Sequence, residues 1–157
     1  MELTLDEALK KGIKAHKSGQ IHEADKIYTA ILQVHPNHSQ ANHNMGILAL
    51  SIDKTQEALP FFKTAVEANP NINQFWLSYI DALIKLGKIT DARVVFNQAK
   101  EKGIEDKIFD QLERRIDQSD KSVGDPASAS IGAVKKSQDP AFGQIQSLIN
   151  LYDQGKL

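Results

Sequence analysis

The feature that most constrains this sequence is a pattern that returns every 34 residues. An alanine followed four residues later by an aromatic residue occurs three times at this interval: Ala24 with Tyr28, Ala58 with Phe62, and Ala92 with Phe96. Further features keep the same interval, namely Gly12 and Gly46, Pro36 and Pro70, and tripeptides that start at Gly19, Asp53 and Gly87. A fixed period of this length is typical of chains built from stacked structural units. The sequence therefore predicts a repeat array.

Each unit is predicted to be a pair of helices. In the first unit Leu5, Leu9 and Ile13 follow one another at four-residue steps, which is the spacing of one helical face. Gly19 suits the left-handed conformation that ends many helices, and Pro36 disfavours helical geometry in the residue before it. Two such helices cannot bury both of their apolar faces alone, so successive pairs are expected to stack.

These residues resemble the tetratricopeptide repeat, whose pattern over 34 residues is W-x2-L-G-x2-Y, then A-x3-F, then P. The A-x3-F part is matched three times, with tyrosine as the aromatic residue in the first unit. Gly12 and Gly46 match the glycine, Met45 replaces the leucine, and Trp76 supplies the tryptophan. The third unit departs from the pattern with Ile80 at the glycine, as is expected of a repeat at the end of an array.

The resemblance implies an all-α fold. The expected architecture is an α-solenoid of three helix pairs in a right-handed superhelix, followed by a capping helix, a flexible linker and a C-terminal helix. The expected boundaries are a solenoid over 1–118, with repeats at about 5–38, 39–72 and 73–106 and a further helix at 104–118, then a linker at 119–140 and a helix at 141–157.

The helix expected at 104–118 has two interpretations. Ile104, Ile108, Leu112 and Ile116 lie at four-residue intervals among charged residues, which predicts an amphipathic helix. A solenoid needs a terminal helix with a polar outer side, so this helix is interpreted as a cap. The alternative is the first helix of a degenerate fourth repeat.

The segment 141–157 is interpreted as the first helix of a truncated further repeat. Its apolar residues include Ile145, Leu148 and Tyr152, and its end, Gly155-Lys-Leu157, copies the turn that begins at Gly19. The sequence is therefore expected to be the front part of a longer protein. Similar repeats often precede a glycosyl-, sulfo- or methyltransferase domain in bacterial proteins. The alternative function of this chain is therefore to recognise the substrate of such a transferase.

Composition excludes several classes of protein. A net charge of −1 provides no field that would attract nucleic acid or an anionic membrane. The absence of cysteine excludes disulfides, thiolate zinc sites and a cysteine nucleophile. No apolar run approaches the roughly 20 residues of a membrane span, and the first residues lack the pattern of a signal peptide. The expected location is the cytoplasm.

No catalytic, cofactor or metal site is predicted. Gly-rich phosphate loops, G-x-S-x-G and H-E-x-x-H are absent from the sequence. His35, His38 and His43 are close in sequence, but the first two flank a predicted turn and the third lies inside the next helix, so they are interpreted as solvated. A strip of lysines at positions 10, 11, 14 and 17 has no aromatic residues for base stacking, so no nucleic-acid partner is expected.

In tetratricopeptide arrays the first helix of each pair lines the concave surface. Carried over to matching positions, this implies a mixed aliphatic and polar surface of twelve candidate protein-binding residues: Leu9, Ile13, His16, Gln40, His43, Asn44, Ile47, Leu50, Gln74, Leu77, Asp81 and Ile84. Several of the aliphatic residues could instead pack between repeats.

The predicted function is a non-catalytic scaffold that binds a peptide or helix of another protein in this concave groove. A clamp for a C-terminal carboxylate is not supported. Of the residues that such a clamp uses, only Asn44 is found at its position in this sequence. A ladder of asparagines is not supported either, because Lys10 and Ser78 occupy the other two positions. Self-association through the C-terminal helix is a further possibility.

Overall fold

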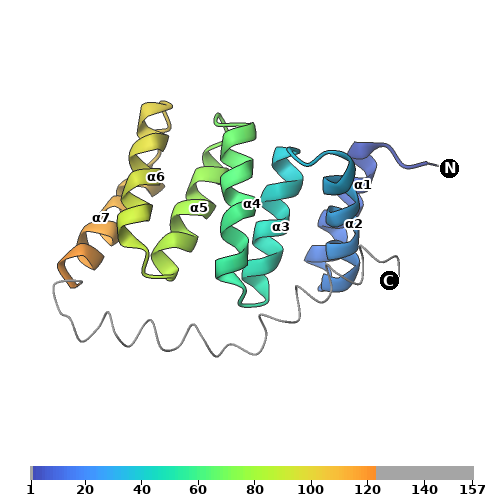
Figure 1. The fold of residues 1–157 in the computed structure, drawn as a ribbon, viewed down its shortest axis with the longest axis horizontal. Helices are drawn as coiled ribbons and strands as arrows, with labels where there is room; N and C mark the ends of the chain where they lie inside the picture. The colour runs from blue at the N-terminus through green and yellow to red at the C-terminus, as the bar shows by residue number, and fades with distance from the viewer. Residues whose placement is uncertain (1, 123–157) are drawn as a thin grey trace.

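The computed structural model describes residues 2–122, in which seven helices and no strand are found. The helices are α1 (Leu5–Lys17), α2 (Ile21–Val34), α3 (Ser39–Ser51), α4 (Thr55–Ala68), α5 (Asn73–Lys85), α6 (Ile89–Glu101) and α7 (Lys107–Ser122). They stand side by side in chain order along one axis (Figure 1). Each of α1, α3, α5 and α7 begins 34 residues after the previous one, so the sequence period is also the structural period.

The turn inside each pair requires a left-handed residue. Gly19, Asp53 and Gly87 hold equivalent places and have φ values of 75°, 59° and 70°. Glycine adopts this conformation readily, whereas a residue with a Cβ atom is strained there. The middle pair therefore carries backbone strain that its two neighbours avoid.

We expect Asp53→Gly to raise the free energy of unfolding by about 0.5–1 kcal/mol, since relief of the strain exceeds the entropy that glycine adds to the unfolded chain. Chemical denaturation measures the change. The reciprocal change Gly87→Asp, at the equivalent position of the next pair, should lower stability by a similar amount. A loss of stability in Asp53→Gly would show that the aspartate side chain stabilises the turn.

A small residue and a large aromatic residue meet inside each of the first two pairs. A Cβ atom added to Gly12 would lie 2.6 Å from Cε1 of Tyr28, and one added to Gly46 would lie 2.5 Å from Cε1 of Phe62. Both aromatic side chains are completely buried. The glycines therefore let the two helices of a pair approach closely enough for the ring to fill the space between them.

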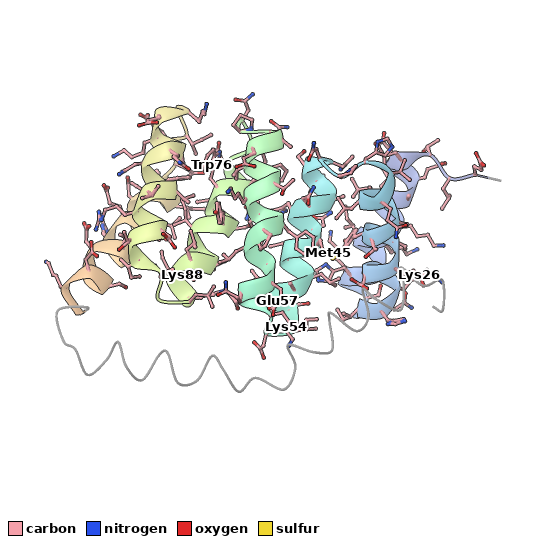
Figure 2. The ribbon with its side chains drawn as sticks, in the orientation of Figure 1. Lys26, Met45, Lys54, Glu57, Trp76 and Lys88 are labelled. Atoms are coloured by element: carbon pink, nitrogen blue, oxygen red, sulfur yellow. The ribbon has the colours of Figure 1, made fainter. Side chains whose placement is uncertain are left out.

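Buried side chains form a continuous series of clusters along the stack. Met45 of α3 packs with Ala24 and Tyr28 of α2, and Trp76 of α5 belongs to the same cluster as Val66 of α4. Figure 2 shows Met45 and Trp76 within the stack of helices. Each pair is thus joined to the next by apolar contact between its first helix and the preceding second helix.

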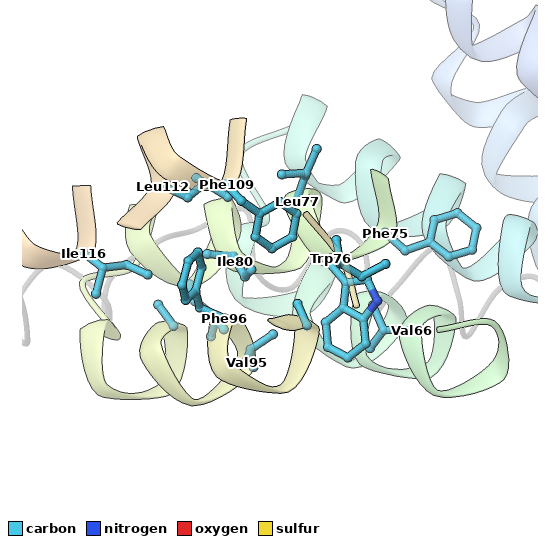
Figure 3. Packing of buried hydrophobic residues seen from close by; sticks show 14 of the residues in the cluster. Val66, Phe75, Trp76, Leu77, Ile80, Val95, Phe96, Phe109, Leu112 and Ile116 are labelled. Atoms are coloured by element: carbon cyan, nitrogen blue, oxygen red, sulfur yellow. The ribbon is translucent and has the colours of Figure 1, made fainter. Parts of the chain in front are cut away.

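The last helix of the described part closes this core. Phe109, Leu112 and Ile116 of α7 are buried and face the cluster that contains Ile80 and Phe96 (Figure 3). α7 contacts both α5 and α6, as a first helix of a fourth pair would. Most of its apolar stripe is therefore used against the third pair, whereas Ile108 is 47% exposed.

α7 differs from the first helices of the first two pairs at one position of the repeat. Arg114 lies three periods after Gly12, at the position where a glycine admits the aromatic ring of a partner helix, and it is exposed. The third pair has Ile80 in place of the glycine. α7 thus has the position of a first helix with a charged residue where the first two pairs have a glycine.

The bounds of α7 differ from the expected 104–118. Ile104 is buried but precedes the helix, and the helix continues to Ser122, into the segment expected to be a linker. Ion pairs explain the extension, because Arg93 of α6 binds both Asp117, at 2.9 Å, and Asp120. The remainder of the expected linker and the helix expected at 141–157 lie outside the described residues.

Candidate protein-binding surface

The first helices of successive pairs lie next to one another. α1 contacts α3, α3 contacts α5, and α5 contacts α7. Helices on the inner side of a curved stack approach each other more closely than those on the outer side. The side formed by α1, α3 and α5 is therefore the candidate binding surface, and all twelve residues selected from the sequence lie on these three helices.

The structure divides those twelve residues by exposure. Gln74 is exposed and His43 and Leu77 are buried, while the other nine are half-buried: Leu9, Ile13, His16, Gln40, Asn44, Ile47, Leu50, Asp81 and Ile84. The aliphatic members Leu9, Ile47, Leu50 and Ile84 pack against core clusters with part of their surface. The surface thus combines structural packing with limited apolar exposure.

His43 is a core residue and not a side chain presented to a partner. Its ring lies between those of Phe62 and Phe75, with centroid distances of 5.7 and 4.8 Å. Its Nε2 atom is 2.8 Å from Oγ of Ser78 on the neighbouring α5. Burial lowers the pKa of His43 to about 4, opposed in part by the Asn44 side chain, so the ring is neutral at pH 7. This corrects two expectations, that His43 is solvated and that it contacts a protein partner.

Leu77 is likewise part of the core cluster that includes residues of α7. It is therefore not a residue that contacts a partner directly. The sequence placed it correctly on the first helix of the third pair. It could not show that α7 covers that part of the surface, because the register of α7 against α5 depends on contacts between helices distant in sequence.

Amides form two short hydrogen-bonded groups on adjacent helices. On α3, Gln40 Nε2 donates to Asn44 Oδ1 at 3.3 Å; on α5, Gln74 Nε2 donates to Ser78 Oγ at 3.2 Å. Asn44 Nδ2 is buried and has no acceptor among the described residues. The α3–α5 junction therefore has a row of polar groups with an unused donor.

Asp81 is held by charges and is not free to bind a cation. Arg115 of α7 donates to it at 2.6 Å, and Lys85 lies at 3.0 Å. Burial raises the pKa of Asp81, but these two partners outweigh it and hold the pKa below its usual value. Sequence reasoning missed Arg115 as a component of this surface, and only the four-residue spacing of Asp81 and Lys85 on one helix indicated part of the group.

His16 lies near the start of the surface, edge-on to the ring of Tyr28 at a centroid distance of 6.4 Å. Burial lowers its pKa. Within residues 2–122 no three histidine or carboxylate side chains come together in a group that could hold a metal ion.

Comparison with known proteins identifies the repeat. The sequence model described as "Tetratricopeptide repeat" matches residues 9–71 and again residues 43–106. The chain belongs to the tetratricopeptide repeat family. The two matches overlap in the second pair, as expected of tetratricopeptide repeats that continue in one register along the chain. No curated protein sequence matches the chain significantly.

Solved structures show the same tetratricopeptide fold at low sequence identity. The TPR2B domain of yeast Sti1, in a complex with pHsp70, superposes with a TM-score of 0.64 at 20% identity over 73% of this chain and 96% of that chain. The type III secretion chaperone SycD of Yersinia enterocolitica, in complex with a peptide of the translocator YopD, gives 0.62 at 15% identity over 79% and 95%. MamA with the substitution D159K gives 0.63 at 23% identity over 87% and 77%.

Among the helices of the described part, none combines the length and apolar character that crossing a membrane requires.

Proposed function

We propose that this chain is a non-catalytic scaffold that binds an extended segment or a helix of another protein along the surface of α1, α3 and α5. The observation that carries the proposal is the meeting of three first helices on one side, with half-buried aliphatic residues and a row of amides at the junction of α3 and α5.

The aliphatic residues supply the non-directional part of the binding. Leu9 and Ile13 of α1 and Ile47 and Leu50 of α3 each keep part of their surface open. A partner that covers several such residues gains roughly 25 cal/mol for each square ångström of apolar surface removed from water. This component favours an amphipathic partner but gives little selectivity between partners.

The amides supply the directional part of the binding, through hydrogen bonds. Gln40 and Gln74 sit at equivalent positions one period apart, so their carboxamides can pair with backbone groups of one bound segment. Asn44 Nδ2 lacks an acceptor in the described structure, and a carbonyl oxygen of a partner would satisfy it once the side chains that cover it rotate. The buried His43–Ser78 contact keeps α3 and α5 at a fixed separation beneath these groups.

The experiment uses peptides selected from a random display library against the full chain, with affinity measured by fluorescence anisotropy. The variant Gln40→Ala, Asn44→Ala, Gln74→Ala should bind the selected peptides at least tenfold more weakly, because about 1 kcal/mol is lost with each hydrogen bond. Its melting temperature should stay within a few degrees of that of the original chain.

A matched control removes three exposed amides from second helices: Gln56→Ala, Asn97→Ala and Gln98→Ala. These lie on α4 and α6, away from the proposed surface, and the control should retain full affinity. Equal affinity of the two triple variants, or loss only in the control, would contradict the proposed surface.

A further inference from the structure

The two ends of the described solenoid differ in chemistry. At the α7 end the exposed residues of the last helix are polar or charged, Arg114 among them, except for Ile108. At the α1 end a groove of about 360 Å³ lies between α1 and α2, and its lining is mainly apolar, with Leu3, Leu5, Ala8, Ile27, Ile31 and Val34 among its residues. Leu3 and Val34 are 57% and 72% exposed, which makes them the most exposed large apolar side chains of the described part.

The repeat period shows what kind of element fits this groove. Ala8 and Lys11 of the groove lie one period before Asn42 and Met45, and two periods before Trp76 and Tyr79. In the second and third pairs Met45 and Trp76 pack against the second helix of the preceding pair. The groove is therefore the surface that receives a helix elsewhere in the stack, and in the described structure it has none.

The chain itself contains a segment of matching chemistry. Phe142, Ile145, Ile149 and Tyr152 follow at intervals of three, four and three residues, so a helix over 141–153 would have one apolar stripe. No residue from Ala141 to Tyr152 is charged. The groove lining has few charged residues, with Lys11 and His35 as its basic members. Burial of such a stripe in an apolar groove is favourable, whereas leaving both exposed is not.

The connection is long enough for the segment to reach the groove of its own chain. Residues 123–140 lie between α7 and the segment and span up to roughly 60 Å when extended. Three helix pairs stacked at a spacing of about 10 Å place α1 roughly 30 Å from α7. Attachment to the same chain also gives the segment an effective concentration of the order of millimolar, which favours its own groove over that of another molecule.

We propose that the segment 141–153 docks as a helix into the apolar groove between α1 and α2 of its own chain. The stack is then covered at both ends, by α7 at one and by the docked segment at the other. This arrangement does not depend on the binding surface of α1, α3 and α5. It buries the apolar stripe of the segment, which would promote association between molecules if it were exposed.

Because the chain contains no cysteine, disulfide trapping tests the docking directly. Val34→Cys in the groove is combined with Leu148→Cys or, to cover the other helical register, Leu151→Cys. After mild oxidation at micromolar concentration we expect a disulfide within one molecule, seen as a faster-migrating monomer on a non-reducing gel. The control replaces Val34→Cys with Val94→Cys, an exposed valine of α6, and should crosslink at least tenfold more slowly.

A second set of variants tests the apolar stripe. Ile145→Asp with Ile149→Asp in the Val34→Cys, Leu148→Cys background should reduce the crosslinking rate to that of the Val94→Cys control. Disulfide-linked dimers in place of monomers would show that a second copy occupies the groove. Equal rates for Val34 and Val94, or no effect of the aspartates, would show that the segment does not dock there. Each of these outcomes overturns the proposal.

Discussion

Phe62→Ala is expected to lower the free energy of unfolding by about 3–5 kcal/mol, the largest effect of any single change considered for this chain. The ring is completely buried between α3 and α4, it contacts the imidazole of His43, and it lies against the backbone of Gly46. Because this pair is the middle one of three, the cavity weakens the link between the first pair and the third. Urea denaturation followed by circular dichroism measures the loss.

A double-mutant cycle with Gly46→Ala tests the geometry of this contact. In the original chain the new Cβ atom would lie 2.5 Å from the ring, so Gly46→Ala should destabilise by about 1–3 kcal/mol despite the better helix propensity of alanine. In the Phe62→Ala background the same substitution points into the cavity and should stabilise by about 0.5–1 kcal/mol. If Gly46→Ala had the same effect in both backgrounds, the close approach of the two residues would be contradicted.

Acidification from pH 7 to pH 4 is expected to cost about 3 kcal/mol of stability through His43 alone. The unfolded chain protonates this histidine near its ordinary pKa of about 6.5, but burial lowers the folded-state pKa to about 4. Between these two values the unfolded state binds more protons, so stability falls as the pH falls. The loss is complete once the pH is below the folded-state pKa.

The variant His43→Gln isolates this contribution because it keeps a hydrogen-bonding group near Ser78 and does not titrate. Its stability should fall less than that of the original chain between pH 6.5 and pH 4, as measured by urea denaturation at a series of pH values. His16, whose pKa burial also lowers, adds a contribution of the same sign in both proteins, and Asp25, whose pKa burial raises, adds one of opposite sign. His35→Gln, at an exposed position, is the control. Parallel pH profiles for the original chain and His43→Gln would exclude the buried histidine as the source.

The sequence by itself determined the repeat and the two helices of each pair. Ala24, Tyr28 and their equivalents one and two periods later are all buried, because a residue that faces the core in one unit faces it in every unit that stacks in the same way. Gly19 and Gly87 marked their turns for a similar reason, since the left-handed conformation is a local property of the backbone.

Tertiary structure decided which residues at the edge of the candidate binding surface remain accessible to solvent. His43 and Leu77 have the same periodic position as half-buried Leu9, yet both are buried, because each is covered by side chains of a neighbouring pair or of α7. The end of α7 and the environment of Asp81 depend on Arg93 and Arg115, which bind carboxylates on another helix. Periodicity identifies the face of a helix that is apolar. How closely the next helix approaches, and which long side chains reach across, is set by packing between residues far apart in sequence.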